Sequence, residues 1–152
     1  MDVWGNRLQF GPALMTRIIL GLGFYYTGKG KLNNLERVSN WFSSLGIPFP
    51  EAHAWFIGHL EYFGGILLLV GLGTRLISML LGSTMVVALL TADKAQFLGS
   101  FTPKGDLPIE VTAFAYLAFL SWLILTGPGF LSLDTVISKQ FGLRPKAETA
   151  TS

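Results

Sequence analysis

Four long apolar stretches dominate the sequence, and they leave little else from which to build a structure. They cover residues 10–27, 52–72, 75–92 and 109–127. A helix needs about 20 apolar residues to cross the hydrocarbon core of a bilayer, and each stretch comes close to that length. Only 13% of the residues are charged, about half of what soluble domains usually carry. We therefore predict an all-α fold, an integral membrane, antiparallel four-helix bundle.

The connections between the stretches predict how the helices are wired. Residues 71–74 are the whole link between the second and third stretches, so these two helices are expected to be antiparallel neighbours. The longer connections, 28–51 and 93–108, then lie on one side of the membrane, and both termini lie on the other. We expect one membrane domain over residues 1–137 and a polar tail over residues 138–152.

Charge and cysteine content narrow the function classes. The Lys and Arg residues are scattered along the chain, so a nucleic-acid partner is not expected. The chain has no cysteine, which excludes disulfides, a thiolate nucleophile, Cys-ligated zinc and iron–sulfur clusters. Arg75 in the shortest connection and the basic residues after the last stretch favour cytoplasmic termini. We place the chain in a bacterial cytoplasmic membrane, among lipids and other membrane subunits.

The second stretch has two different faces. One face is continuously apolar and suits lipid, whereas the other places small residues around the carboxylate of Glu61. A carboxylate in hydrocarbon is costly, so Glu61 is expected to point into the bundle, where it needs a partner. Arg17 lies about 7.5 Å and Glu61 about 15 Å from the same side of the bundle, a gap comparable to one arginine side chain. We therefore predict that the two are coupled directly or through one polar group. The lipid-facing set is Phe56, Leu60, Phe63 and Leu67, and the inward set adds Gly58, Tyr62 and Gly65.

The same helical spacing predicts the inward faces of the other three stretches. In each of them, small or polar residues recur on one side of the helix. The predicted sets are Arg17, Gly21, Phe24 or Tyr25, and Gly28 in the first stretch, Arg75, Ser78, Gly82, Met85, Leu89 and Asp93 in the third, and Ala115, Ala118 and Trp122 in the fourth.

Glu61 is the sharpest functional candidate. An intramembrane carboxylate can relay protons or accept a hydrogen bond from a quinol hydroxyl, and its alternative role is a structural pin between helices. Arg17 and Arg75 offer planar donors to a quinone carbonyl or a lipid phosphate, or they simply satisfy a carboxylate or reach the headgroups. His59 and Tyr25 are further hydrogen-bond candidates for a quinone pocket.

Metal and haem sites are not expected. His53 and His59 lie about 240° apart around one helix, so they cannot hold one iron together, although His59 alone could act with a partner chain. Glu61 lacks the Glu-x-x-His partners that a dinuclear site requires. We predict no metal and no covalent cofactor, and a quinone or a lipid as the bound molecule. Residues 40–50 are unusually apolar for a loop, and we expect them to lie on the membrane or to dock on a partner. The alternative is that they roof a groove for a quinone or lipid tail.

The order of several short strings resembles the DoxX-like family of four-helix integral membrane proteins. The strings are Arg17-Ile-Ile-Leu-Gly21, Gly28-Lys-Gly-Lys31-Leu32, Leu45-Gly-Ile-Pro48, Glu61-Tyr-Phe-Gly64-Gly65-Ile-Leu-Leu-Leu, Gly71-Leu-Gly-Thr74-Arg75 and Thr126-Gly-Pro-Gly129-Phe-Leu-Ser-Leu-Asp134. The residues that match the shared pattern are Arg17, Lys31, Glu61, Gly64, Gly65, Thr74, Arg75, Ser132 and Asp134.

The resemblance implies a subunit or partner of an oxidoreductase, because members of this family are linked with quinone reduction and with oxidative-stress assemblies. On this basis we expect an oxidoreductase-associated membrane subunit of an electron-transport complex, accessory rather than an independent enzyme. The alternative is a non-catalytic structural or assembly subunit. The chain departs from the family at Thr91-Ala-Asp93, where a histidine often stands, and at Gly105-Asp-Leu-Pro-Ile-Glu110. A proton or metal role of that histidine is therefore not carried over.

Overall fold

The computed structural model describes residues 10–101, 107–127, 129 and 132–134. Helices make up the regular structure of these residues, and no strand occurs among them, so the all-α prediction is confirmed for this part of the chain. The predicted polar tail, 138–152, lies outside the described residues. The elements are α2 (Phe10–Asn33), α3 (Leu35–Ser44), α4 (Pro50–Val70), α5 (Thr74–Leu90), α6 (Lys94–Gly99), the 3-10 turn η1 (Pro108–Glu110) and α7 (Thr112–Thr126).

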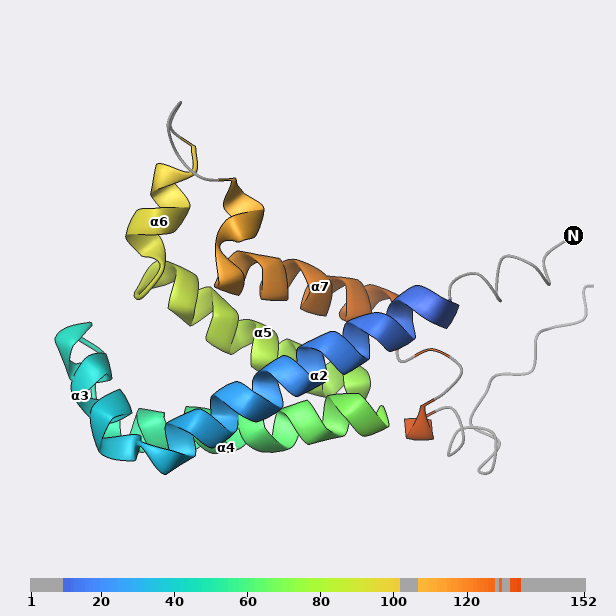
Figure 1. Ribbon diagram of the computed structural model, residues 1–152, viewed down its shortest axis with the longest axis horizontal. Helices are drawn as coiled ribbons and strands as arrows, with labels where there is room; N and C mark the ends of the chain where they lie inside the picture. The colour runs from blue at the N-terminus through green and yellow to red at the C-terminus, as the bar shows by residue number, and fades with distance from the viewer. Residues whose placement is uncertain (1–9, 102–106, 128, 130–131, 135–152) are drawn as a thin grey trace, which may run out of the picture.

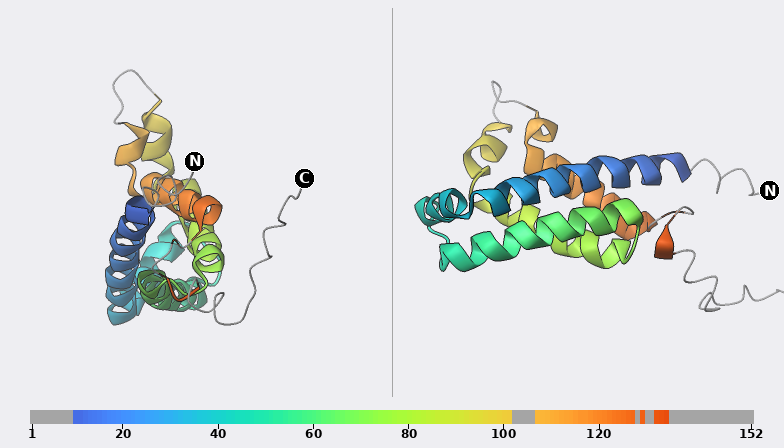
Figure 2. Two further views of the ribbon diagram at one scale, coloured as in Figure 1. Left: turned by 90° about the vertical axis from the view of Figure 1, so that its right-hand side faces the viewer. Right: turned by 60° about the horizontal axis from the view of Figure 1, so that its bottom comes forward.

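Two antiparallel helix pairs form the body of the structure. Helix α2 lies along α4, and α5 lies along α7 (Figures 1 and 2). Helix α5 also packs on α4, the helix that precedes it across the short turn, as the sequence predicts. The shared core of the two pairs is apolar and consists of Leu20, Phe24, Leu68, Leu81, Leu120 and Leu123. The start of α2 and the α4–α5 turn lie at one end of the body, and α3 and α6 lie at the other (Figure 1).

Glycines allow the backbones of α2 and α4 to touch. A Cβ atom added to Gly65 would lie 2.7 Å from the backbone oxygen of Gly21 and 2.5 Å from the backbone nitrogen of Tyr25. A Cβ atom at Gly28 would overlap the backbone of Tyr62. Such close approach is typical of small-residue contacts between membrane helices, and it fixes the register of α2 against α4.

Helix α2 is longer than predicted and continues past residue 27 to Asn33. Lys31 lies in its last turn, where a cation complements the helix dipole. The following connection holds α3, an amphipathic helix that buries Ser39 and Phe42. By length and composition, α4 is the helix among the described residues that can cross a membrane; α5 and α7 are apolar but shorter, with 17 and 15 residues.

The predicted faces are confirmed for α2 and largely for α4 but are wrong for α7. Gly58, Glu61 and Gly65 are buried on α4, although the predicted lipid-facing Leu60 packs partly against the core. On α5, Ser78 and Gly82 are buried, but Arg75 is exposed. On α7 the predicted Ala118 and Trp122 are exposed, because larger side chains fill the core instead. The buried residues of α7 are Ala113, Leu120 and Leu123.

Candidate functional site

Two charged side chains are almost completely buried in the described part of the chain. Arg17 and Glu61 each expose 1% of their surface. They occupy different places: Arg17 lies near the α4–α5 turn, and Glu61 lies toward the end that carries α3. A buried charge is costly unless it is paired, so the partners of each side chain decide what it can do.

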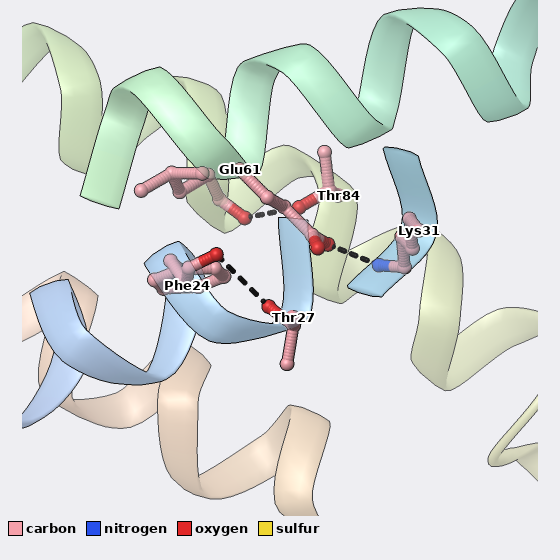
Figure 3. Close-up of polar contacts among 6 residues, drawn as sticks. Phe24, Thr27, Lys31, Glu61 and Thr84 are labelled. Carbon is pink, nitrogen blue, oxygen red and sulfur yellow. Dashed lines mark hydrogen bonds and ion pairs between the residues drawn. The ribbon is translucent and has the colours of Figure 1, made fainter. Parts of the chain in front are cut away.

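Glu61 is paired with Lys31 rather than with Arg17. The Lys31 ammonium donates to Glu61 Oε1 at 2.5 Å, and it remains 23% exposed. The other carboxylate oxygen, Oε2, is buried and has no hydrogen-bond partner in the described part of the chain. Figure 3 shows the carboxylate pointing toward Lys31, with Thr84 beside it. One half of this buried carboxylate is therefore satisfied, and the other half is not.

An apolar groove meets this carboxylate. It holds about 410 Å³ of empty space, part of which is open to the surroundings. Lys31, Glu61, Thr84 and Thr91 supply the polar side chains of its lining, and α3 with the turn after it supplies one aromatic wall. Part of the 40–50 segment thus lines a groove, which was the alternative interpretation; its place on the membrane or on a partner stays a prediction. The apolar part of the lining is Trp41, Phe42, Leu45, Ile47, Ile57, Met85, Val87, Ala88 and Ala92.

Arg17 binds the carboxyl-terminal end of α4. Its Nε donates to Leu68 O at 3.0 Å and its Nη2 donates to Leu69 O at 3.1 Å. These carbonyls lie in the last turn of the helix, where carbonyls lack partners within the helix and a cation complements the dipole. Arg17 therefore satisfies backbone groups that the helix itself leaves open.

Asp134 binds the amino-terminal end of the next helix. Its carboxylate accepts hydrogen bonds from Gly73 N at 2.7 Å and Thr74 N at 3.0 Å, and its own N–H donates to Gly71 O at 3.1 Å. Gly71 has a φ of 76°, and a Cβ atom there would overlap the Arg17 guanidinium. The two charges thus cap the two helix ends that meet at this turn.

The predicted coupling of Arg17 with Glu61 is wrong as a direct contact. Helix α4 places Leu68 seven residues after Glu61, about 10 Å along the helix axis. The close contacts of Gly28 with Tyr62 and of Gly65 with Tyr25 fix this register. The prediction ended the first helix near residue 27. It therefore did not consider Lys31, which lies in the last turn of the same helix, as the partner of Glu61.

The other predicted quinone ligands lie away from the groove. His59 Nδ1 is 2.8 Å from Trp55 O, and its ring packs between Trp55 and Phe63 on the outer face of α4. The Tyr25 ring packs on Tyr62 at a centroid distance of 5.1 Å.

Arg75 is exposed and lies close to Gly127, where the guanidinium Nε would be 3.4 Å from an added Cβ atom. Of the five predicted site residues, the structure therefore brings Glu61 alone into the lining of the groove.

The family-pattern residues mark helix contacts. Lys31 pairs with Glu61, and Gly65 faces α2. A Cβ atom on Gly64 would lie 3.2 Å from the Leu81 side chain, and Thr74 begins α5 at the Asp134 cap. Lys31 was predicted from the sequence only as a residue of the family pattern, and its role as the partner of Glu61 was missed. Its signal was present, because it continues the inward spacing of Arg17, Gly21, Phe24 and Gly28 by one more step.

Two buried hydroxyls of α5 also lack partners. The side chains of Thr74 and Ser78 are completely buried, and neither hydroxyl makes a hydrogen bond within the described residues. Other helical hydroxyls, such as those of Ser83 and Thr84, donate to a carbonyl of the preceding turn. No group of three or more His, Asp or Glu residues suited to a metal ion occurs among the residues that the structure describes.

Comparison with known proteins relates the chain to one family. The model of the DoxX family matches residues 13–94, more than half of the chain, and this range holds Arg17, Lys31, Glu61 and Thr74. A protein of Bacillus subtilis (strain 168) with the name "Putative oxidoreductase CatD" is 33% identical over 129 residues. The match covers 83% of this chain and 87% of the relative. No solved structure matches the chain.

Proposed function

The chain belongs to the DoxX family of membrane proteins, and on this premise we propose that it is an accessory subunit of a membrane oxidoreductase or electron-transfer complex. In this role it binds the head group of a quinone in the groove at Glu61, with a lipid as the alternative occupant. The name of the Bacillus relative supports the oxidoreductase association. The observation that carries the binding site is a buried carboxylate oxygen that has no partner within the described part of the chain and belongs to a residue lining an apolar groove.

We further propose that α2, α4, α5 and α7 all cross the bilayer. Large apolar side chains are exposed on the outside of each of these helices. Contiguous apolar surface of this extent is rare on soluble proteins, whereas lipid covers it without penalty. Examples from the four helices are Ile19 and Leu22, Phe56 and Phe63, Leu76 and Met79, and Phe119 and Leu125.

Cysteine labelling tests this topology, because the chain has no cysteine of its own. Ser44→Cys at the end of α3 and Thr126→Cys at the end of α7 lie at opposite ends of the proposed bundle. A membrane-impermeant maleimide applied to intact cells should label Ser44→Cys and spare Thr126→Cys, if the termini are cytoplasmic. Equal labelling of both positions from outside would contradict the four-span topology.

The quinone site predicts what the chain carries when it leaves the membrane. Protein purified from native membranes in a mild detergent should retain quinone, together with the chains of an oxidoreductase. Glu61→Leu should lose the quinone but keep the partner chains, because the substitution changes the groove and leaves the outer surface intact.

Glu51→Leu is the matched control, since Glu51 lies in the first turn of the same helix and is exposed. Quinone that remains with Glu61→Leu would contradict the site. Partner chains without any quinone in the wild type would favour the structural subunit instead.

A further inference from the structure

We propose that the groove selects the reduced, hydroxyl-bearing form of a quinone over its oxidised form. This inference rests on the proposed function and adds the redox form of the ligand. Its basis is a pair of polar groups in the lining of the groove. One is a buried carboxylate oxygen, Glu61 Oε2, that accepts no hydrogen bond from the residues that the structure describes. The other is the Lys31 ammonium, which uses one donor on Glu61 Oε1 and is partly exposed.

The neighbouring side chains do not supply the missing donor. Thr84 lies beside Glu61 in Figure 3, but its hydroxyl donates to Leu81 O at 2.7 Å. Thr27, on the facing helix, donates to Phe24 O at 3.1 Å. Both hydroxyls are therefore committed to their own helices. A hydroxyl of a bound molecule can supply the donor that completes the carboxylate.

A hydroxyl meets the two polar groups better than a carbonyl does. A hydroxyl both donates and accepts, so it can donate to Glu61 Oε2 while it accepts from Lys31. A quinone carbonyl only accepts; it can bind Lys31, but it leaves Oε2 unpaired and places its own lone pairs beside a carboxylate. Leaving a buried charged acceptor unpaired is costly, so we expect the quinol to bind about tenfold more tightly or better.

The free oxygen can be presented without moving a helix. The terminal torsion of a glutamate is broad, so the carboxylate can turn toward the groove while Lys31 holds one oxygen. Trp41 and Phe42 line the same groove and give it an aromatic wall, on which a flat aromatic head group can stack. The surrounding apolar side chains suit the tail.

Four ligands with the same decyl tail test the inference on the full-length protein in detergent. They are a benzoquinol kept reduced under argon, the corresponding benzoquinone, the dimethyl ether of the quinol, and 1-decanol. Equilibrium dialysis followed by extraction measures each dissociation constant. We expect the quinol to bind at least about tenfold more tightly than each of the other three ligands. In Glu61→Gln, whose amide can donate to a carbonyl, the preference for quinol over quinone should disappear, whereas Glu51→Gln should retain it.

The outcomes separate the two proposals. Equal binding of quinone and quinol would overturn the redox preference and leave a quinone site in place. Binding of the dimethyl ether as tight as that of the quinol would show that Glu61 accepts no donor from the ligand, which also overturns it. Binding of 1-decanol as tight as that of the quinol would indicate that the ligand is a lipid alcohol rather than a quinol. Binding of none of the four would remove both the preference and the proposed site.

Discussion

The two buried charges of this bundle lie in opposite kinds of environment. Arg17 sits at a closed junction, where it donates to the last carbonyls of α4 while Asp134 caps the first amides of α5. Glu61 lies at an open junction, because it lines a groove. Lys31 binds its Oε1, and its Oε2 has no partner among the described residues. Both side chains expose only 1% of their surface, so burial does not distinguish them.

The hydrogen-bond partners of a buried charge, rather than how deeply it is buried, therefore identify the candidate site. At the closed junction each charge completes a helix end, and such an arrangement stabilises the turn. At the open junction one carboxylate oxygen has no partner among the described residues, which is costly for stability alone and calls for a water, an ion or a ligand as its partner. An apolar layer that includes Leu20, Phe24 and Leu68 separates the two junctions.

The largest expected effect comes from removing the single cation at the open junction. Lys31→Met leaves the Glu61 carboxylate buried without a partner, which should lower the free energy of unfolding by about 3 kcal/mol. Lys29→Met is the control, because Lys29 is exposed and makes only a distant contact with the Tyr25 ring. Equilibrium unfolding in mixed micelles, followed by circular dichroism, measures both. Equal stability of the two variants would show that Lys31 does not neutralise Glu61.

The register between the junctions depends on Gly65. Gly65→Ala places a methyl group against the backbone of α2 and should cost about 1–3 kcal/mol. Gly30→Ala, on the exposed side of α2, meets nothing within 4 Å and should be neutral or stabilise by up to about 1 kcal/mol. The same unfolding assay compares them. A harmless Gly65→Ala would mean that α2 and α4 are not in the described register, and the contrast between the junctions would fail.

A smaller effect is expected at the closed junction. Asp134→Ala removes the acceptor of two amides at the start of α5, which should cost about 1 kcal/mol of stability, as for other helix caps. Quinol binding in the groove should not change, because the cap lies at the opposite end of the bundle. A loss of binding without a loss of stability would show that the two junctions communicate.

The smallest effect is expected at Ser78. Its hydroxyl is buried and makes no hydrogen bond to any residue that the structure describes, so Ser78→Ala removes an unsatisfied polar group and should leave stability unchanged or slightly raised. Ser83→Ala on the exposed side of the same helix is the control. Melting temperatures in detergent suffice for this comparison. A clear destabilisation by Ser78→Ala would show that the Ser78 hydroxyl has a hydrogen-bond partner.

The sequence predicted the helices better than the pairing of their charges. Periodicity and glycine spacing found the all-helical fold and the inward position of Glu61, because both depend on local pattern. The choice between Arg17 and Lys31 depends on where α2 ends and how far it slides along α4, which close backbone contact at Gly28 and Gly65 decides. The return of Asp134 to the α4–α5 turn joins residues about 60 apart in sequence, and no local pattern encodes it.

A double-mutant cycle tests the separation of the two junctions most directly. Glu61→Gln is combined with Lys31→Met in one cycle and with Arg17→Met in the other, and unfolding free energies are measured for all variants. We predict a coupling free energy of about 1–3 kcal/mol between Glu61 and Lys31 and of no more than about 0.5 kcal/mol between Glu61 and Arg17. Strong coupling of Glu61 to Arg17, with additive losses for Lys31, would contradict it.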